Sequence, residues 1–171
     1  MTDTTEIPRT DHQGDERATL QSFLTYTRAI AVRLVEGVDD DAARVVRAEP
    51  LTSLLGLLKH LTDVERFWFQ DAWAGRDLEF GWSDEDIDGE WRIQPHDTVA
   101  SLVAAYRQAT AESDEVLGAG DLDALAAKQV GAAARQVSLR WVGWHLVEET
   151  ARHNGHLDIL RQQIDGLAGI E

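Results

Sequence analysis

Residues 144–156 read WHLVEETARHNGH, and this stretch is the most informative about both fold and function. At about 100° per residue, a helix over it places four ionisable side chains within roughly 80° of one another. They are His145, Glu149, His153 and His156. Apolar residues occupy the same face at helical spacing: Val142, Leu146, Leu157, Leu160 and Ile164. We therefore predict a long helix that turns imidazoles and a carboxylate toward the protein core.

Ionisable groups in an apolar stripe need a partner, because burying them alone is costly. A divalent metal is the simplest one, since it binds neutral imidazole and ionised carboxylate together. Glu149 and His153 are i, i+4 and can reach the same ion, although exposed ion pairs share this spacing. For His145 and His156 the alternatives are a ligand role, a place beside the site or a place at an interface. Gly155 is unfavourable within a helix, and we interpret it as permitting close helix packing near the site.

Three further amphipathic segments precede this helix. Helices are expected over 15–36, from Thr52 or Ser53 to Trp73, and from a cap at Asp97 or Thr98 to Leu117. Residues 37–41 break the first segment, and Ser138 can cap the last helix, which is expected to end near Asp165. The fold class predicted is all-α, a four-helix bundle with long loops, over residues 15–171. Residues 1–14 are expected to be a flexible tail.

The second predicted helix carries His60 within its apolar face, beside Leu57, Val64 and Phe67. A single core histidine is more often structural than a ligand. Together with Glu149 and His153 on another helix, His60 becomes a candidate third ligand, because bundles build metal sites from facing helices. The long acidic loop over 76–96 adds Trp82 and Trp91 as candidates for lining the mouth of a pocket.

Composition excludes several functional classes. The chain has 171 residues and a net charge of −15, from 31 acidic and 16 basic residues. That charge disfavours nucleic acid and anionic membranes as partners. No apolar run reaches membrane-spanning length and the N-terminus lacks a signal-peptide pattern, so a cytoplasmic protein is expected. Cysteine is absent, which means that any thiol chemistry requires an external thiol.

The segments LKHLTDVER at 58–66 and ETARHNGH at 149–156 resemble the DinB-like superfamily, which includes mycothiol-dependent maleylpyruvate isomerase. The likeness covers nearly the whole chain after the tail and is closest to actinobacterial members. It implies a four-helix bundle with a divalent metal, usually zinc or nickel, and assigns His60, Glu149 and His153 as its ligands. Glu149 matches the mycothiol-dependent enzymes, whereas many other members have histidine there. The resemblance assigns no ligand role to His156.

This resemblance leads to a functional expectation: a metal-dependent S-transferase that joins mycothiol, or a similar low-molecular-weight thiol, to a small electrophile. The alternatives are a metal-dependent hydrolase and a non-enzymatic metal- or ligand-binding stress-response protein. Since no separate C-terminal domain such as the isomerase carries is apparent, we do not expect maleylpyruvate as the substrate. Relatives often pair, so a homodimer is a further expectation.

Overall fold

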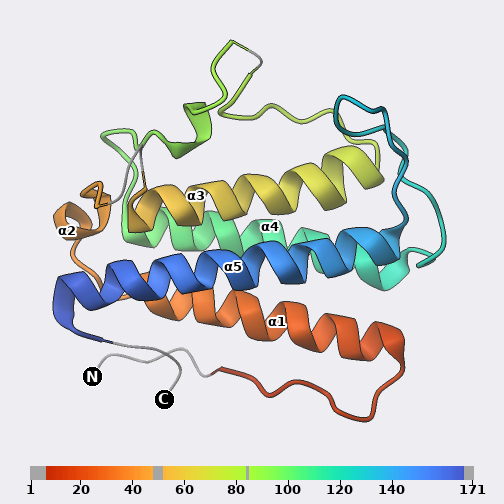
Figure 1. Ribbon diagram of the computed structural model, residues 1–171, viewed down its shortest axis with the longest axis horizontal. Helices are drawn as coiled ribbons and strands as arrows, with labels where there is room; N and C mark the ends of the chain where they lie inside the picture. Colours follow the sequence, from red (N-terminus) through yellow and green to blue (C-terminus); the bar gives the residue numbers. More distant parts are fainter. Residues whose placement is uncertain (1–6, 48–51, 84, 168–171) are drawn as a thin grey trace.

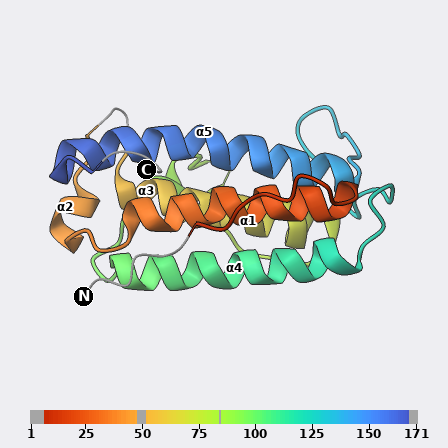
Figure 2. The same ribbon diagram turned by 90° about the horizontal axis from the view of Figure 1, so that it is seen from below.

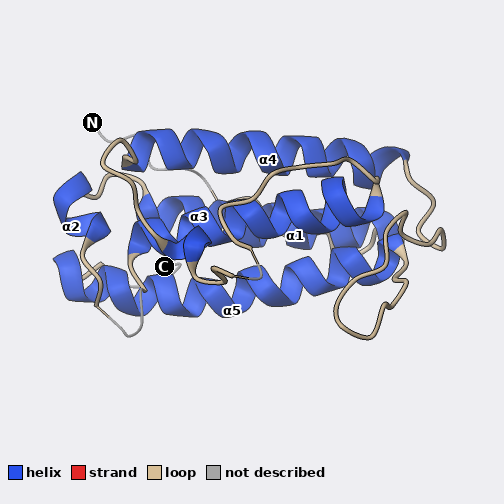
Figure 3. Ribbon diagram, turned by 90° about the horizontal axis from the view of Figure 1, so that it is seen from above, coloured by secondary structure: helices blue, strands red, loops and turns tan. Residues whose placement is uncertain are grey.

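Four long helical segments lie side by side along the molecule (Figure 1). They are α1 (Glu16–Val35), α3 (Leu54–Glu65) with its continuation η1 (Arg66–Trp73), α4 (Val99–Ala119) and α5 (Leu139–Asp165). Figure 2 shows α4 and α5 on opposite sides of the pair formed by α1 and α3. The computed structural model describes residues 7–47, 52–83 and 85–167, which form helices, loops and isolated bridges but no strand (Figure 3). The predicted all-α bundle is confirmed.

Polar caps set the beginnings of the long helices. The side chains of Asp15, Ser53, Thr98 and Ser138 each accept a hydrogen bond from a backbone N–H in the first turn. These contacts satisfy N–H groups that have no partner within the helix. At the other end of α5, Gly166 adopts a left-handed conformation with φ of 76°. All four caps lie at or next to the positions that the sequence predicts.

Two short elements fall in segments predicted to be irregular. Helix α2 (Asp40–Arg44), capped by Asp39, begins within the break predicted at 37–41 and continues beyond it. The 3-10 turn η2 (Gly89–Trp91) lies in the acidic loop. The second predicted helix also differs in character, because its last part, η1, is a π-helix rather than an α-helix.

The core joins the helices through apolar packing and a buried ion pair. Leu57, Leu58 and Leu61 of α3 are almost fully buried, as is Leu146 of α5. Arg28 on α1 donates to both carboxylate oxygens of Glu65, at 2.6 and 2.7 Å, and to Asp114 on α4 at 2.7 Å. Paired in this way, the charge of Arg28 is retained inside the bundle, and it ties three helices together.

The interpretation of Gly155 is wrong. It is exposed, and a Cβ built there would meet no atom within 4 Å. Close packing instead occurs at Gly143, where a Cβ would lie 2.6 Å from Cδ2 of Leu20 on α1.

Part of the segment predicted as a tail contacts the bundle. Ile7 packs against the core, and the backbone N–H of Asp11 donates to the Ser22 hydroxyl at 2.8 Å. Residues 1–6 lie outside the described residues, and flexibility of 1–14 stays a prediction.

Candidate metal centre

Facing sides of α3 and α5 bring the three predicted ligands together. His60, Glu149 and His153 each offer one donor atom, and these atoms lie within 4.8 Å of one another. Nε2 of His153 is 3.4 Å from Oε2 of Glu149, and the rings of His60 and His153 have centroids 4.8 Å apart. Donor atoms bound at about 2.1 Å to one tetrahedral ion are roughly 3.4 Å apart. The spacing therefore suits a single divalent ion.

The protonation state of His153 also favours the binding of a metal cation. His153 is buried, and this burial, helped by the adjacent His60 ring, lowers its pKa to about 4. Its imidazole is therefore neutral near pH 7, the form that binds a metal. Nδ1 of His60 is buried and forms no aligned hydrogen bond within the described residues. Two imidazoles and a carboxylate are a donor set that zinc accepts, and imidazole also suits nickel.

Neighbouring side chains approach the same ligands, and one of them, Glu90, was not singled out from the sequence. Oε1 of Glu90, in η2, lies 3.1 Å from Nδ1 of His60, although the two are not aligned for a hydrogen bond. Trp91 stacks on the His60 ring with centroids 4.3 Å apart and planes 15° from parallel. On the α5 side, Arg152 donates to Oε1 of Glu149, while Oε2 faces His153. These neighbours restrict the orientation of both ligand side chains.

The two tryptophans proposed for a pocket mouth have separate places. Trp91 covers His60, whereas Trp82 packs in an aromatic cluster with Phe67 and Phe80, with centroids 5.9 and 5.6 Å away. Neither lines the cavity that is bordered by Trp68 and Trp141. Sequence alone could not separate their roles, because the loop has no periodicity that would show which side chains face the bundle.

His145 and His156 lie beside the ligand group on α5. Nδ1 of His156 is 3.3 Å from Nδ1 of His153, and the residue is exposed, so the expectation that it faces the core is wrong. His145 is half-buried, and burial lowers its pKa. It forms a second cluster with Glu148 and Glu149, whose donor atoms also lie within 4.8 Å of one another. Glu149 is thus common to both clusters.

Comparison with known proteins agrees with this architecture. The family model for mycothiol-S-transferase matches residues 19–166, a range that includes α1 from its fourth residue, all of α2 to α5 and the three predicted ligands. No curated protein matches the chain. Within the described residues, no helix combines the length and the apolar character needed to cross a membrane. The chain belongs to the mycothiol-S-transferase family, a DinB-like family.

Proposed function

We propose that this member of the mycothiol-S-transferase family holds one divalent ion, zinc or nickel, through His60, Glu149 and His153. Its activity would be the transfer of an external thiol, mycothiol, to a small electrophile. The observation that carries the proposal is the convergence of three donor atoms, within 4.8 Å, from two facing helices. Because the chain has no cysteine, the reacting thiol must come from another molecule.

Each ligand side chain contributes separately. Glu149 supplies the negative charge that favours a cation over a proton, and Arg152 fixes its other oxygen. His153 is available in its neutral form because burial keeps its pKa low. With Nε2 directed toward Glu149, its Nδ1 can donate to His156, which sets the tautomer and the ring orientation. Beside the other histidine, Oε1 of Glu90 lies 3.1 Å from Nδ1 of His60.

A divalent ion held by His60, Glu149 and His153 would lower the pKa of a thiol that binds it, and this would make the thiol a stronger nucleophile near neutral pH. The sulfur then forms a bond to the electrophilic carbon while the leaving group departs with its electron pair. The thiol proton passes to water. The chain supports this reaction by holding the ligands in place and by partly enclosing them under Trp91, whose ring stacks on His60.

The test combines metal analysis with a thiol-transfer assay. Untagged protein is expected to contain one zinc or nickel per chain, and to join mycothiol to monochlorobimane with loss of chloride, only when metal and thiol are both present. His60→Ala should abolish the activity. The matched control is His12→Ala, which removes an exposed histidine whose Nε2 lies 3.3 Å from the Thr10 hydroxyl, far along the chain from the predicted ligands.

Each other outcome contradicts the proposal in its own way. Turnover without thiol would favour the metal-dependent hydrolase. Metal binding with no transfer across several thiols and electrophiles would favour the non-enzymatic protein. Absence of bound metal, together with no stabilisation by added zinc, would refute the site itself.

Further expectations accompany the proposal and stay predictions. They are a homodimer, a cytoplasmic location, an actinobacterial origin, and the lack of nucleic-acid and membrane partners. Sedimentation of purified protein over a range of concentrations tests the first.

A further inference from the structure

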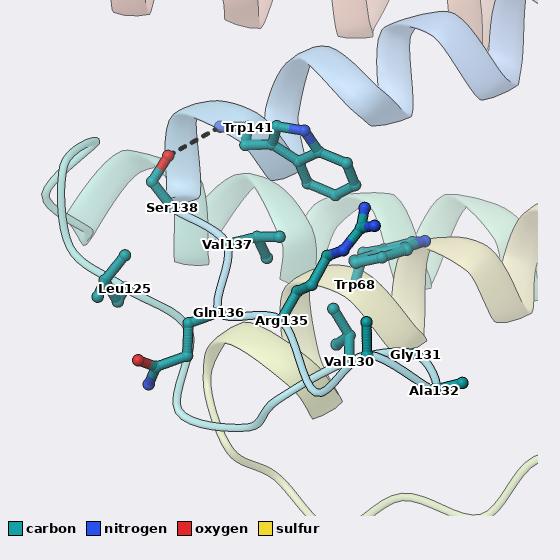
Figure 4. Close-up of a pocket in the computed structure, with 11 residues that line it drawn as sticks. Trp68, Leu125, Val130, Gly131, Ala132, Arg135, Gln136, Val137, Ser138 and Trp141 are labelled. Atoms are coloured by element: carbon teal, nitrogen blue, oxygen red, sulfur yellow. Dashed lines mark hydrogen bonds between the residues drawn. The ribbon is translucent and has the colours of Figure 1, made fainter.

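A cavity of about 870 Å³ opens between η1, the beginning of α5 and the loop before α5 (Figure 4). Its walls are mainly apolar and include Val130, Val137 and the indole rings of Trp68 and Trp141. The two indoles have centroids 5.2 Å apart and planes tilted by 57°. This volume is typical of small-molecule sites, and a pair of inclined indoles offers two faces to a flat apolar ligand.

The charge at this cavity is opposite to that of the protein as a whole. The chain has 31 acidic residues, yet none of the described residues that line the cavity is acidic. Arg135 is the only charged side chain among them, and in Figure 4 it reaches toward the space between Trp68 and Trp141. No side-chain hydrogen bond or ion pair of Arg135 is found within the described part of the chain. An anionic group on a ligand is the natural partner for this guanidinium.

His145 connects the cavity to the candidate metal centre. Its ring centroid is 4.7 Å from those of both Trp68 and Trp141, and it stacks on Trp141 with planes 22° apart. Its donor atom in turn lies within 4.8 Å of that of Glu149. From Trp141 to Glu149 the helix rises by about 12 Å. A ligand that fills the cavity and also reaches the metal centre must therefore be elongated.

We propose that the cavity binds the body of the electrophile, and that this substrate is an elongated aromatic molecule with an acidic group at the end away from its reactive carbon. The inference rests on the proposed function, because that function assigns the reactive carbon to the group formed by His60, Glu149 and His153. The aromatic body lies against Trp68 and Trp141, and the acidic group faces Arg135. In the reaction, sulfur bonds to the terminal carbon, the leaving group departs with its electron pair and the thiol proton goes to water.

Binding is tested first without metal or thiol, so that the result does not depend on transfer. The probe is 5-(2-aminoethylamino)naphthalene-1-sulfonate, titrated with metal-free protein and followed by its fluorescence. We expect saturable binding at one site per chain. Trp141→Ala should weaken it about tenfold, since one aromatic contact face is lost.

Trp144→Ala is the matched control. Both tryptophans are exposed on α5, with 45% of Trp141 and 40% of Trp144 accessible, but Trp144 packs against Phe23 and does not line the cavity. It should leave the affinity unchanged. Arg135→Gln should weaken binding of the sulfonate probe by about two- to fivefold, the range for an exposed ion pair. Binding of the analogue that lacks the sulfonate should be unaffected. Arg135 is exposed, so this variant is expected to fold normally.

The iodoacetyl derivative of the same probe then tests the role in transfer, with iodoacetamide as the compact comparison. Trp141→Ala should raise KM for the naphthalene substrate about tenfold and leave iodoacetamide unaffected. Absence of saturable binding, or equal weakening by Trp144→Ala, would overturn the inference. Binding that depends on Trp141 without transfer to any thiol would refute the proposed function while supporting the class of ligand assigned to the cavity.

Discussion

Acidification of the metal-free protein from pH 7 to pH 5 is expected to remove roughly 2 kcal/mol of stability through His153 alone. Burial lowers the pKa of this imidazole from its ordinary 6.5 to about 4 in the folded protein. The unfolded chain therefore binds a proton more readily than the folded one between these values. Stability from this group is complete above pH 6.5 and decreases as the pH falls toward 4. Because each pKa unit corresponds to about 1.4 kcal/mol, the full loss would approach about 3 kcal/mol.

The assay is urea unfolding of the chelator-treated protein at a series of pH values. His153→Gln should have a pH dependence that is smaller by roughly 2 kcal/mol between pH 7 and pH 5. His12→Gln, which removes an exposed histidine, should follow the parent protein. The comparison also cancels the contribution of carboxylates such as Asp63. Burial raises the pKa of Asp63, so this residue makes the protein more stable, not less, as the pH falls. For a chain of this size the loss corresponds to a fall in Tm of roughly 4–8 °C.

Parallel pH profiles for the parent and His153→Gln would refute this reasoning, because they would show that His153 is not desolvated in the folded state. Saturating zinc supplies a second measurement. It should make the parent more sensitive to acid, since protons and metal compete for the same imidazole. No such change is expected in His153→Gln.

The remaining predictions concern the ligands and two glycines of α5. His60→Ala should lose tightly bound metal but keep its helical circular dichroism at room temperature, since packing of the four amphipathic segments supplies most of the stability; an unfolded variant would show a mainly structural role. Glu149→Gln should weaken metal affinity measured by chelator competition, whereas His156→Ala should retain the metal content. Gly155→Ala should stabilise the fold by about 1 kcal/mol in urea unfolding. Gly143→Ala should destabilise it by about 1–3 kcal/mol, and equal effects of the two would contradict the packing described for α5.

The long helices were predictable because local signals define them. Each amphipathic segment begins at a residue whose side chain can cap it, and Gly166 ends the last one. The uncertainty of one residue at two N-termini arose because adjacent residues could both cap, and the structure selects Ser53 and Thr98. Helix α2 was missed because its five residues are too few to show a helical period.

The three ligands could be predicted from the sequence, whereas the contacts around them could not. The resemblance assigned His60, Glu149 and His153 jointly, and helical spacing explains why the last two meet. The contacts of Glu90 and Trp91 with His60 could not be predicted in this way, because a loop has no regular period to indicate which residues turn back toward α3. Their position depends on tertiary packing of η2 against that helix.

The π-helical segment η1 links the candidate metal centre to the cavity, and the helical periodicity of the sequence does not distinguish it from an α-helix. In a continuous α-helix Trp68 would lie about 80° around the axis from His60. The wider turns of η1 hold more residues each, which reduces this angle and brings Trp68 toward the side that His60 occupies. Both rings then face α5, where His60 meets His153 at 4.8 Å and Trp68 meets His145 at 4.7 Å. A local departure from α-helical geometry thus aligns the cavity and the candidate ligands along one side of α5.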